Sequence, residues 1–128
     1  ERIVNAPVLG VTTLFSNTLI PSSNPCEPGG RGWVMGVNPF TGGRQDFDVF
    51  DFNRDGVVDA GDQVTQSSAD GTSPRVVGSG YSTDSLPGSP LQLGKQQIVG
   101  GSDGTAQSRA VFNGARPGRV SWKEIVGD

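Results

Sequence analysis

The chain lacks histidine entirely and has one cysteine among its 128 residues. Without histidine it cannot form, within itself, a Ser-His-Asp or Cys-His catalytic arrangement or an imidazole-ligated zinc site. Its glycine-rich turns also lack the GxxxxGK[ST] pattern of a phosphate-binding loop. We therefore predict that the chain is not an enzyme. The single cysteine, Cys26, cannot form an internal disulfide, so it is either a free thiol or half of a bridge to a cysteine elsewhere.

Positive charge and long apolar runs are also scarce. Ten Lys and Arg residues against 13 Asp and Glu give a net charge of −3 and a pI of about 4.8. No basic surface therefore indicates a nucleic-acid partner. The chain has no apolar run long enough for a membrane span, so we predict no transmembrane segment in it. It begins at Glu1 with neither a methionine nor a signal-type apolar segment, and we expect a fragment or a processed piece.

Glycine and proline are abundant where helix-forming patterns are missing. The chain has 20 Gly and 9 Pro, and 33% of its residues are hydrophobic. No stretch of about a dozen residues keeps an amphipathic helical period without a breaker, whereas short β-branched runs are bounded by turn residues. We predict an all-β fold of antiparallel sheets in one domain over residues 1–128, or in a fragment of a larger domain. The expected strands are 2–4, 11–15 with an extension over 18–20, 33–37, 48–50, 91–93, 97–99, 105–112 and 119–126.

Two features of this pattern concern burial. Residues 67–89 are rich in Ser, Gly, Thr and Pro, and we predict a long loop or a partly disordered insertion there. The two tryptophans, Trp33 and Trp122, are predicted to be buried core anchors, with ligand-stacking platforms as the alternative.

The segment Asp51–Asp62, DFNRDGVVDAGD, has the oxygen-ligand spacing of an EF-hand-type calcium loop. Side-chain oxygens recur at alternate positions, a glycine at the sixth position permits a sharp turn, and a carboxylate closes the loop at the twelfth. We predict a calcium ion (Ca²⁺) there, with Asp62 closing the loop on one turn of helix over 59–64. Because position 12 is Asp rather than the longer Glu, we expect moderate affinity. The candidate ligands are Asp51, Asn53, Asp55, the carbonyl of Val57, Asp59 and Asp62.

The charge around this loop supports a cation. Six of the 13 acidic residues fall within positions 46–62, with Arg44 and Arg54 as the nearby cations. So many like charges repel one another unless a positive ion lies among them. The alternative is an ordinary acidic turn, since Asp, Asn and Gly are common turn residues.

Several sequence motifs resemble the C-terminal region of the PilY/PilC family of type IV pilus tip-associated adhesins. They are TLIPSSNPC (18–26), GWVMGVNPFTGGR (32–44), VFDFNRDGVVD (49–59) and GRVSWK (118–123). The similarity is good over residues 2–62 and looser over 95–126. It implies a modified β-propeller of which this chain supplies two or three blades at most, with the calcium loop lying between strands. It also implies ligation by Asp51, Asn53, Asp55, Asp59 and the Val57 carbonyl, whereas Asp62 follows from the loop spacing alone.

The resemblance implies a calcium-binding module of a pilus-associated adhesin. Such a module would regulate pilus biogenesis, twitching motility and surface adhesion at the extracellular face of the bacterium, with pilins, minor pilins and a host surface as candidate partners. The alternative function is a dockerin-like or EF-hand interaction module. That alternative needs a second calcium loop and flanking helices, but the later Asp-Gly pairs, Asp70-Gly71 and Asp103-Gly104, lack companion carboxylates.

Overall fold

The computed structural model describes residues 1–26 and 29–114, and this part of the chain is built from antiparallel strands. No α-helix occurs in it, and one turn of 3₁₀ helix, η1, covers Ala60–Asp62. The expected all-β fold class is therefore confirmed. In chain order the strands are β1 (Arg2–Ile3), β2 (Val8–Leu9), β3 (Leu14–Pro21), β4 (Gly30–Val37), β5 (Val64–Thr65), β6 (Arg75–Val76), β7 (Gly80–Thr83), β8 (Leu91–Leu93), β9 (Gln96–Gly100) and β10 (Ala106–Ala110).

The larger sheet is built around the β3–β4 hairpin. These strands pair from Leu14 opposite Val37 to Pro21 opposite Gly30, and β7 continues the sheet beyond β4. On the other side of β3, both β1 and β2 pair with it, which gives a five-stranded sheet in the order β1-β3-β4-β7 with β2 also on β3. The strand predicted over 11–15 with an extension over 18–20 is thus one strand, but it begins at Leu14, so residues 11–13 lie outside it.

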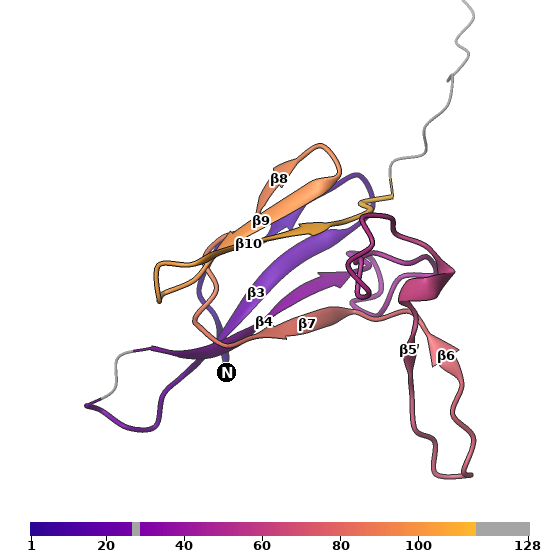
Figure 1. Ribbon diagram of the computed structural model, residues 1–128, viewed down its shortest axis with the longest axis horizontal. Coiled ribbons are helices and arrows are strands. Elements are labelled where there is room, and N and C mark those ends of the chain that lie inside the picture. Colours follow the sequence, from indigo (N-terminus) through magenta and orange to yellow (C-terminus); the bar gives the residue numbers. More distant parts are fainter. Residues whose placement is uncertain (27–28, 115–128) are drawn as a thin grey trace, which may run out of the picture.

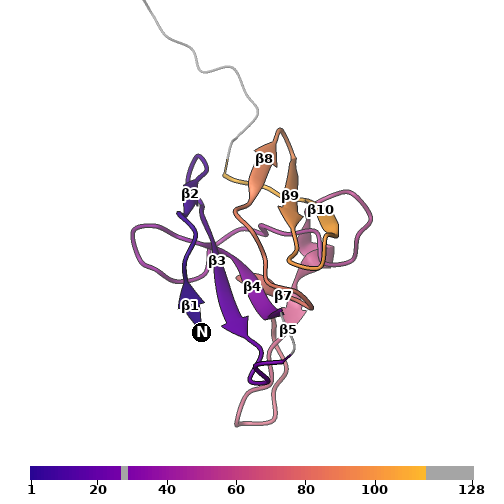
Figure 2. The same cartoon turned by 90° about the vertical axis from the view of Figure 1, so that its left-hand side faces the viewer.

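The second sheet packs against the first and encloses the core. It has the order β10-β9-β8, and Figures 1 and 2 show it lying beside β3 and β4, with the β5–β6 hairpin extending away from both sheets. The two sheets do not close into a ring within the described residues. Core residues come from both sheets and from the segment that precedes the candidate calcium loop: Phe15, Val34, Val49, Phe50, Tyr81, Val99 and Val111.

Strand β7 corrects the prediction of a loop throughout residues 67–89. It pairs with β4, and Tyr81 packs its ring edge-on against Phe50 with the ring centroids 5.4 Å apart. At Gly80 the backbones approach so closely that an added Cβ would lie 2.5 Å from the Val34 carbonyl oxygen. The glycine that suggested a loop is therefore what allows the strand to pair, and the neighbouring β6 pairs with β5.

Two further expectations can be compared with the fold. Trp33 was predicted as a buried anchor, but its side chain lies on the outer face of β4 and is 40% exposed, so this prediction is wrong. The inward positions on that strand belong to Val34 and Gly36, because successive side chains of a strand alternate between its faces. Cys26 is an exposed free thiol within this chain. Trp122 and the strand expected over 119–126 lie outside the described residues.

The outer strands leave apolar side chains in contact with solvent. Ile3, Val4, Leu9 and Val11, all on or beside β1 and β2, are each more than half exposed, as are Leu91 and Leu93 on β8. These strands form the edges of the two sheets. Among the described residues, no helix is long and apolar enough to cross a membrane.

The central position of Phe50 leads to a stability prediction. Phe50→Ala removes a fully buried ring that contacts Phe15, Phe52 and Tyr81. We expect a loss of about 3–5 kcal/mol in the free energy of unfolding, the usual range for a buried Phe→Ala change. Urea denaturation followed by tryptophan fluorescence would measure it. Phe40→Ala is the matched control, since Phe40 is 91% exposed and should change stability little; equal losses in the two variants would contradict the assigned core.

Candidate metal centre

The candidate calcium loop, residues 51–62, is attached at its first residues to the two packed sheets. Phe50 forms a β-bridge with Val111, and the Asp51 amide donates to the Ala110 carbonyl at 3.1 Å. On the same residue, the Asp51 carbonyl accepts a 2.6 Å hydrogen bond from Nη1 of Arg109 on β10. The Arg109 guanidinium lies 4.2 Å from the Tyr81 ring centroid, a cation–π distance. The start of the loop is thus fixed to both sheets.

The first half of the loop is organised by the Asp51 carboxylate. Its Oδ1 accepts from the Asp55 amide at 3.2 Å and its Oδ2 from the Gly56 amide at 2.8 Å. This closure requires a sharp turn, in which Arg54 has a φ of 63° and Gly56 a φ of 90°. Such angles are costly for most residues and favourable for glycine, which explains Gly56 at the sixth position. Asp51 is 3% exposed, and its carboxylate points into the loop.

The middle of the loop consists of overlapping side-chain turns. Asn53 Oδ1 accepts from the Asp55 amide at 2.9 Å, and Asp55 Oδ1 accepts from the Val57 amide at 2.8 Å. Asp and Asn form such turns readily because their short side chains reach the amide two residues ahead. The second carboxylate oxygen of Asp55, its Oδ2, accepts no hydrogen bond within the described part of the chain. The Oδ2 atom of Asp55 is therefore not used by the hydrogen bonds that shape the loop.

The second half of the loop closes on Asp62. Asp59 caps η1 by accepting from the Gly61 amide at 2.7 Å, and Asp62 Oδ2 accepts from the Asp59 amide at 3.0 Å. Asp62 Oδ1 also reaches back to the amides of Phe52 and Asn53, at 2.8 and 3.1 Å. The helical turn expected over 59–64 is present over Ala60–Asp62, and Asp62 does face back into the loop. Because Asp62 is 2% exposed, its charge is held by backbone amides rather than by water.

The structure brings all six predicted ligand residues into one loop but does not assemble them around a single point. Within residues 1–26 and 29–114, no group of three or more Asp, Glu, Cys or His side chains is arranged to hold a metal ion. Asp51 and Asp62 are buried and lie on the inner side of the loop, whereas Asn53, Asp55, Val57 and Asp59 are exposed. The carboxylates are directed to backbone amides of the same loop, and the donor set consists of oxygen atoms throughout, which suits a hard cation such as Ca²⁺.

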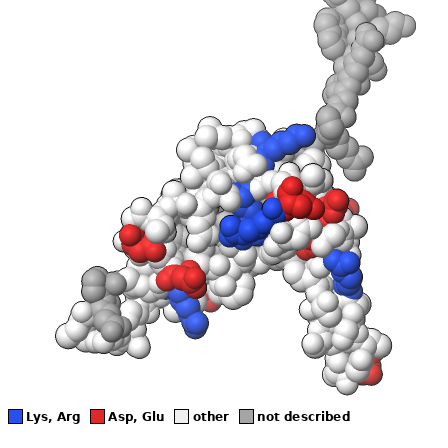
Figure 3. All heavy atoms as spheres, in the orientation of Figure 1, with Lys and Arg blue, Asp and Glu red and all other residues white. Residues whose placement is uncertain are grey.

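Two charged residues outside the loop also belong to this region. Burial raises the pKa of the Asp48 carboxyl, and repulsion from Asp62 and Asp59 adds to the rise, while a hydrogen bond from Gln63 and the charge of Arg75 act in the opposite direction. Arg75 on β6 donates to the carbonyls of Gly61 and Gln63 at 2.9 and 3.1 Å. Sequence reasoning counted Asp48 among the clustered acids but missed Arg75, which is brought in by the β5–β6 pairing. Figure 3 shows acidic atoms in several separate places on the face in view, and one of these groups, on the right, lies directly beside basic atoms.

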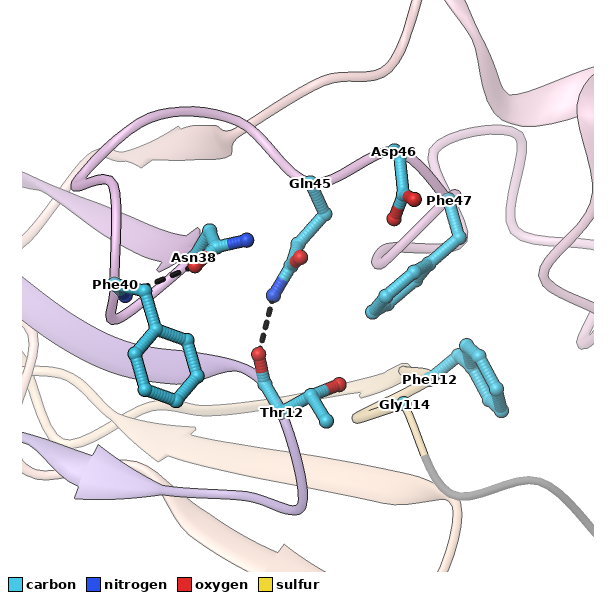
Figure 4. Close-up of a pocket in the computed structure, with 8 residues that line it drawn as sticks. All are labelled: Thr12, Asn38, Phe40, Gln45, Asp46, Phe47, Phe112 and Gly114. Atoms are coloured by element: carbon cyan, nitrogen blue, oxygen red, sulfur yellow. Dashed lines mark hydrogen bonds between the residues drawn. The ribbon is translucent and has the colours of Figure 1, made fainter.

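A separate concavity of about 430 Å³ is lined partly by the segment that leads towards the loop. Figure 4 shows the Phe40 and Phe47 rings on its two sides, with the Gln45 amide donating to the Thr12 carbonyl. The Asn38 side-chain oxygen accepts from the Phe40 amide. Asp46 supplies the charged group of the lining. The Gln45 and Asn38 side chains are thus engaged with backbone, and no basic side chain lies beside Asp46 in this lining.

Comparison with known proteins reveals related sequences. No protein-family model matches the chain. It is 32% identical over 114 residues to "Type IV pilus biogenesis factor PilY1" of Pseudomonas aeruginosa strain UCBPP-PA14, a match covering 88% of this chain and 9% of the relative. It is 34% identical over 129 residues to "Type IV pilus biogenesis factor PilY1 homolog" of Xylella fastidiosa strain Temecula1, covering 98% of this chain and 10% of that relative. The chain thus spans about a tenth of the length of these relatives.

The fold also matches a solved structure. The crystal structure of the Pseudomonas aeruginosa PilY1 C-terminal domain superposes with a TM-score of 0.62 and 24% identity, covering 88% of this chain and 21% of the solved chain. At this identity the likeness concerns the fold, and it agrees with the β-propeller-like class expected from the sequence motifs.

The raised pKa of Asp48 gives a pH-dependent stability prediction for the calcium-free chain. A carboxyl whose pKa is raised on folding destabilises the fold when ionised, and this cost disappears as the pH falls through its folded-state pKa, above the usual 3.8. Asp48→Asn should therefore raise the urea midpoint at pH 7, and the gain should shrink as the pH approaches about 4.

Asp70→Asn is the matched control for that measurement. The Asp70 pKa is lowered by hydrogen bonds from Thr72, so its ionised form stabilises the fold at pH 7 and the substitution should lower the midpoint. An Asp48→Asn midpoint at or below that of the unmodified chain at pH 7 would contradict the raised pKa that burial and repulsion give to Asp48.

Proposed function

This chain belongs to the PilY1 family of type IV pilus biogenesis factors, and from this premise we propose that it is a calcium-binding module of a pilus-associated adhesin. In this proposal the module is not an enzyme. It works at the bacterial surface, outside the cell, and contacts pilins, minor pilins or a host surface. Its role is to regulate pilus biogenesis, twitching motility and adhesion through the order of one loop.

The observation that carries the proposal is the conformation of the candidate loop. Asp51, Asn53, Asp55 and Asp59 each accept a hydrogen bond from an amide two to five residues ahead, and Asp62 closes the loop from its far end. Four carboxylates are thereby held within one twelve-residue loop, with Asp48 beside it. Acidic groups held this close repel one another, and a divalent cation is the economical source of compensating charge.

The residues fit a calcium ion in the chemistry of their oxygen donors and in their spacing along the loop. The proposed ligands are the oxygen donors Asp51, Asn53, Asp55, the Val57 carbonyl and Asp59, with Asp62 as the loop-closing carboxylate. Asp55 and Asp59 each hold one carboxylate oxygen on a loop amide and leave the other, Oδ2, for an ion. Asp62 is less available to an ion than Asp55 and Asp59, because both of its carboxylate oxygens already accept hydrogen bonds from backbone amides. When bound, the ion supplies positive charge and cross-links the two halves of the loop.

The position of the loop explains how calcium could regulate without being needed for the fold. The loop leaves the core at Phe50 and returns through η1 to the β5–β6 hairpin, so its exit leads to a strand rather than to the long helix of a dockerin or EF-hand. The buried core residues lie outside positions 51–62, and Phe52 is the loop side chain that packs against them. Releasing the ion should therefore loosen the loop and the root of the hairpin while the apolar core stays buried.

Calcium binding can be measured directly on the 128-residue chain. Native mass spectrometry in calcium should give one ion per chain, removed by chelator. Asp51→Ala should abolish binding, because it also removes the acceptor for the Asp55 and Gly56 amides of the turn. Asp59→Ala should weaken binding less, since the ninth position often acts through water. Asp70→Asn, an exposed acid outside the loop, should bind as the unmodified chain does. A chain that gains no mass in calcium would remove the basis of the proposal.

Calcium binding should also raise the stability of the folded chain. At free calcium about 100 times the dissociation constant, the free energy of unfolding should rise by about 2.7 kcal/mol, since the ion binds the folded chain.

In cells, Asp59→Ala in the protein that carries this chain should alter surface piliation or twitching at an unchanged protein level. Normal piliation, motility and adhesion in a variant that binds no calcium would reduce the site to a structural role.

A further inference from the structure

A small cavity lies against the candidate calcium loop, and its wall includes Asp51, the first of the proposed ligands. Its volume is about 160 Å³, and residues of the loop and of the β9–β10 hairpin form its wall. The charged residues of this wall are Asp51 and Arg54 of the loop and Arg109 on β10. Two of these three are arginines, in a chain whose net charge is negative.

Arg109 is held in place before any ligand arrives. Its guanidinium lies over the Tyr81 ring and donates from Nη1 to the Asp51 carbonyl. That bond uses one of the five N–H donors of the side chain, and the remaining ones keep the geometry that matches carboxylate and phosphate groups. A fixed guanidinium loses little side-chain entropy when it binds an anion.

Arg54 brings a second guanidinium to the same place. It has the left-handed φ of 63° within the turn closed by Asp51, so the loop fold sets the direction of its side chain. Arg44 and Arg75 donate to protein oxygens, whereas Arg54 is exposed and makes no hydrogen bond with the described residues. Both Arg54 and Arg109 lie close enough to the Tyr81 hydroxyl to oppose the rise that burial causes in its pKa. The two cations therefore converge on one region.

The volume of the cavity and the chemistry of its hydrogen-bond donors limit the kinds of ligand that it can hold. One water occupies about 30 Å³ in the liquid, so the cavity has room for roughly five heavy atoms. That is the size of a carboxylate or phosphate group and well below the roughly 300 Å³ at which whole-metabolite pockets begin. Two guanidinium groups are donors suited to an oxyanion, and guanidinium groups bind such groups with paired hydrogen bonds.

We propose that this cavity is an oxyanion site, taking a carboxylate or phosphate group of a partner when the neighbouring loop holds its cation. The inference rests on the proposed calcium function for one reason of charge. Without the ion, the carboxylates of Asp51, Asp55 and Asp59 repel an incoming anion and compete for the arginines. With the ion bound, its two positive charges offset two of those three negative charges, and the two arginines then attract the anion. The loop then acts as a calcium-dependent contact point for an acidic group.

The test uses the isotopically labelled 128-residue chain, with sodium acetate as the carboxylate probe and sodium sulfate as the tetrahedral probe. Each is titrated in calcium and in chelator, at constant ionic strength made up with chloride, while the arginine Nε–H signals are followed by NMR. We expect saturating shifts of the Arg54 and Arg109 signals in calcium, and affinity at least about tenfold weaker in chelator. The probe that binds more tightly identifies the preferred oxyanion.

Matched variants isolate the cavity from general charge effects. Arg54→Asn removes the guanidinium and suits the left-handed backbone, and it should weaken anion binding about tenfold, the effect of one charge-assisted hydrogen bond. Arg31→Gln removes the same charge from an exposed site on β4 that does not line the cavity, and should leave the affinity unchanged. Shifts that grow linearly with concentration, or equal affinity in Arg54→Asn and the unmodified chain, would overturn the proposal.

A calcium titration of the same sample separates this inference from the proposed function. Calcium binding without anion saturation overturns the oxyanion site and leaves the calcium site intact. Anion binding of equal strength in calcium and in chelator overturns the link between the two sites. If no calcium binds, the proposed function fails, and saturation in chelator then decides whether the cavity alone takes an anion.

Discussion

The buried ring of Phe50 is the contact on which the rest of the molecule depends. It packs edge-on against Phe15 of β3, Tyr81 of β7 and Phe52 of the loop, with centroid distances of 6.0, 5.4 and 5.9 Å. Its backbone bridges Val111 beyond β10, so one residue joins both sheets at the point where the candidate metal loop begins. The loop is consequently a rigid extension of the core at its start, and the order of its side chains depends on how well this junction is packed.

Local sequence signals predicted the strands that are marked by alternating apolar residues, and they failed where long-range contact decides the structure. β4 and β9 appear where β-branched residues lie between turn residues. The sequence did not predict β7, because Gly80 and the serines around it are typical of loops. The close approach of β7 to β4 explains why a glycine stands at position 80. The prediction that Trp33 is buried was wrong for a related reason. Large hydrophobic side chains are buried on average, but the register of β3 and β4 turns this side chain outward.

The candidate site shows the same division. The twelve-residue spacing was sufficient to predict one loop closed by Asp62, because all of the loop's internal hydrogen bonds join residues at most ten positions apart. The residues that connect the loop to the body were not predictable in this way. Arg109 is 58 positions from the carbonyl it binds, and Arg75 reaches the loop through a hairpin that the composition conceals. Local chemistry thus specifies the loop, and the pairing of distant strands specifies which charges surround it.

The two exposed valines, the isoleucine and the leucine along β1 and β2 have a consequence for handling the chain in solution. Edge strands with free backbone amides and apolar side chains are templates for pairing with other strands, and a net charge of −3 gives weak mutual repulsion between copies. Concentration and salt should therefore govern colloidal behaviour more than folding stability does, since salt screens the little repulsion there is. In the proposed function, bound calcium would add to this effect by cancelling negative charge and so lowering the electrostatic barrier to self-association.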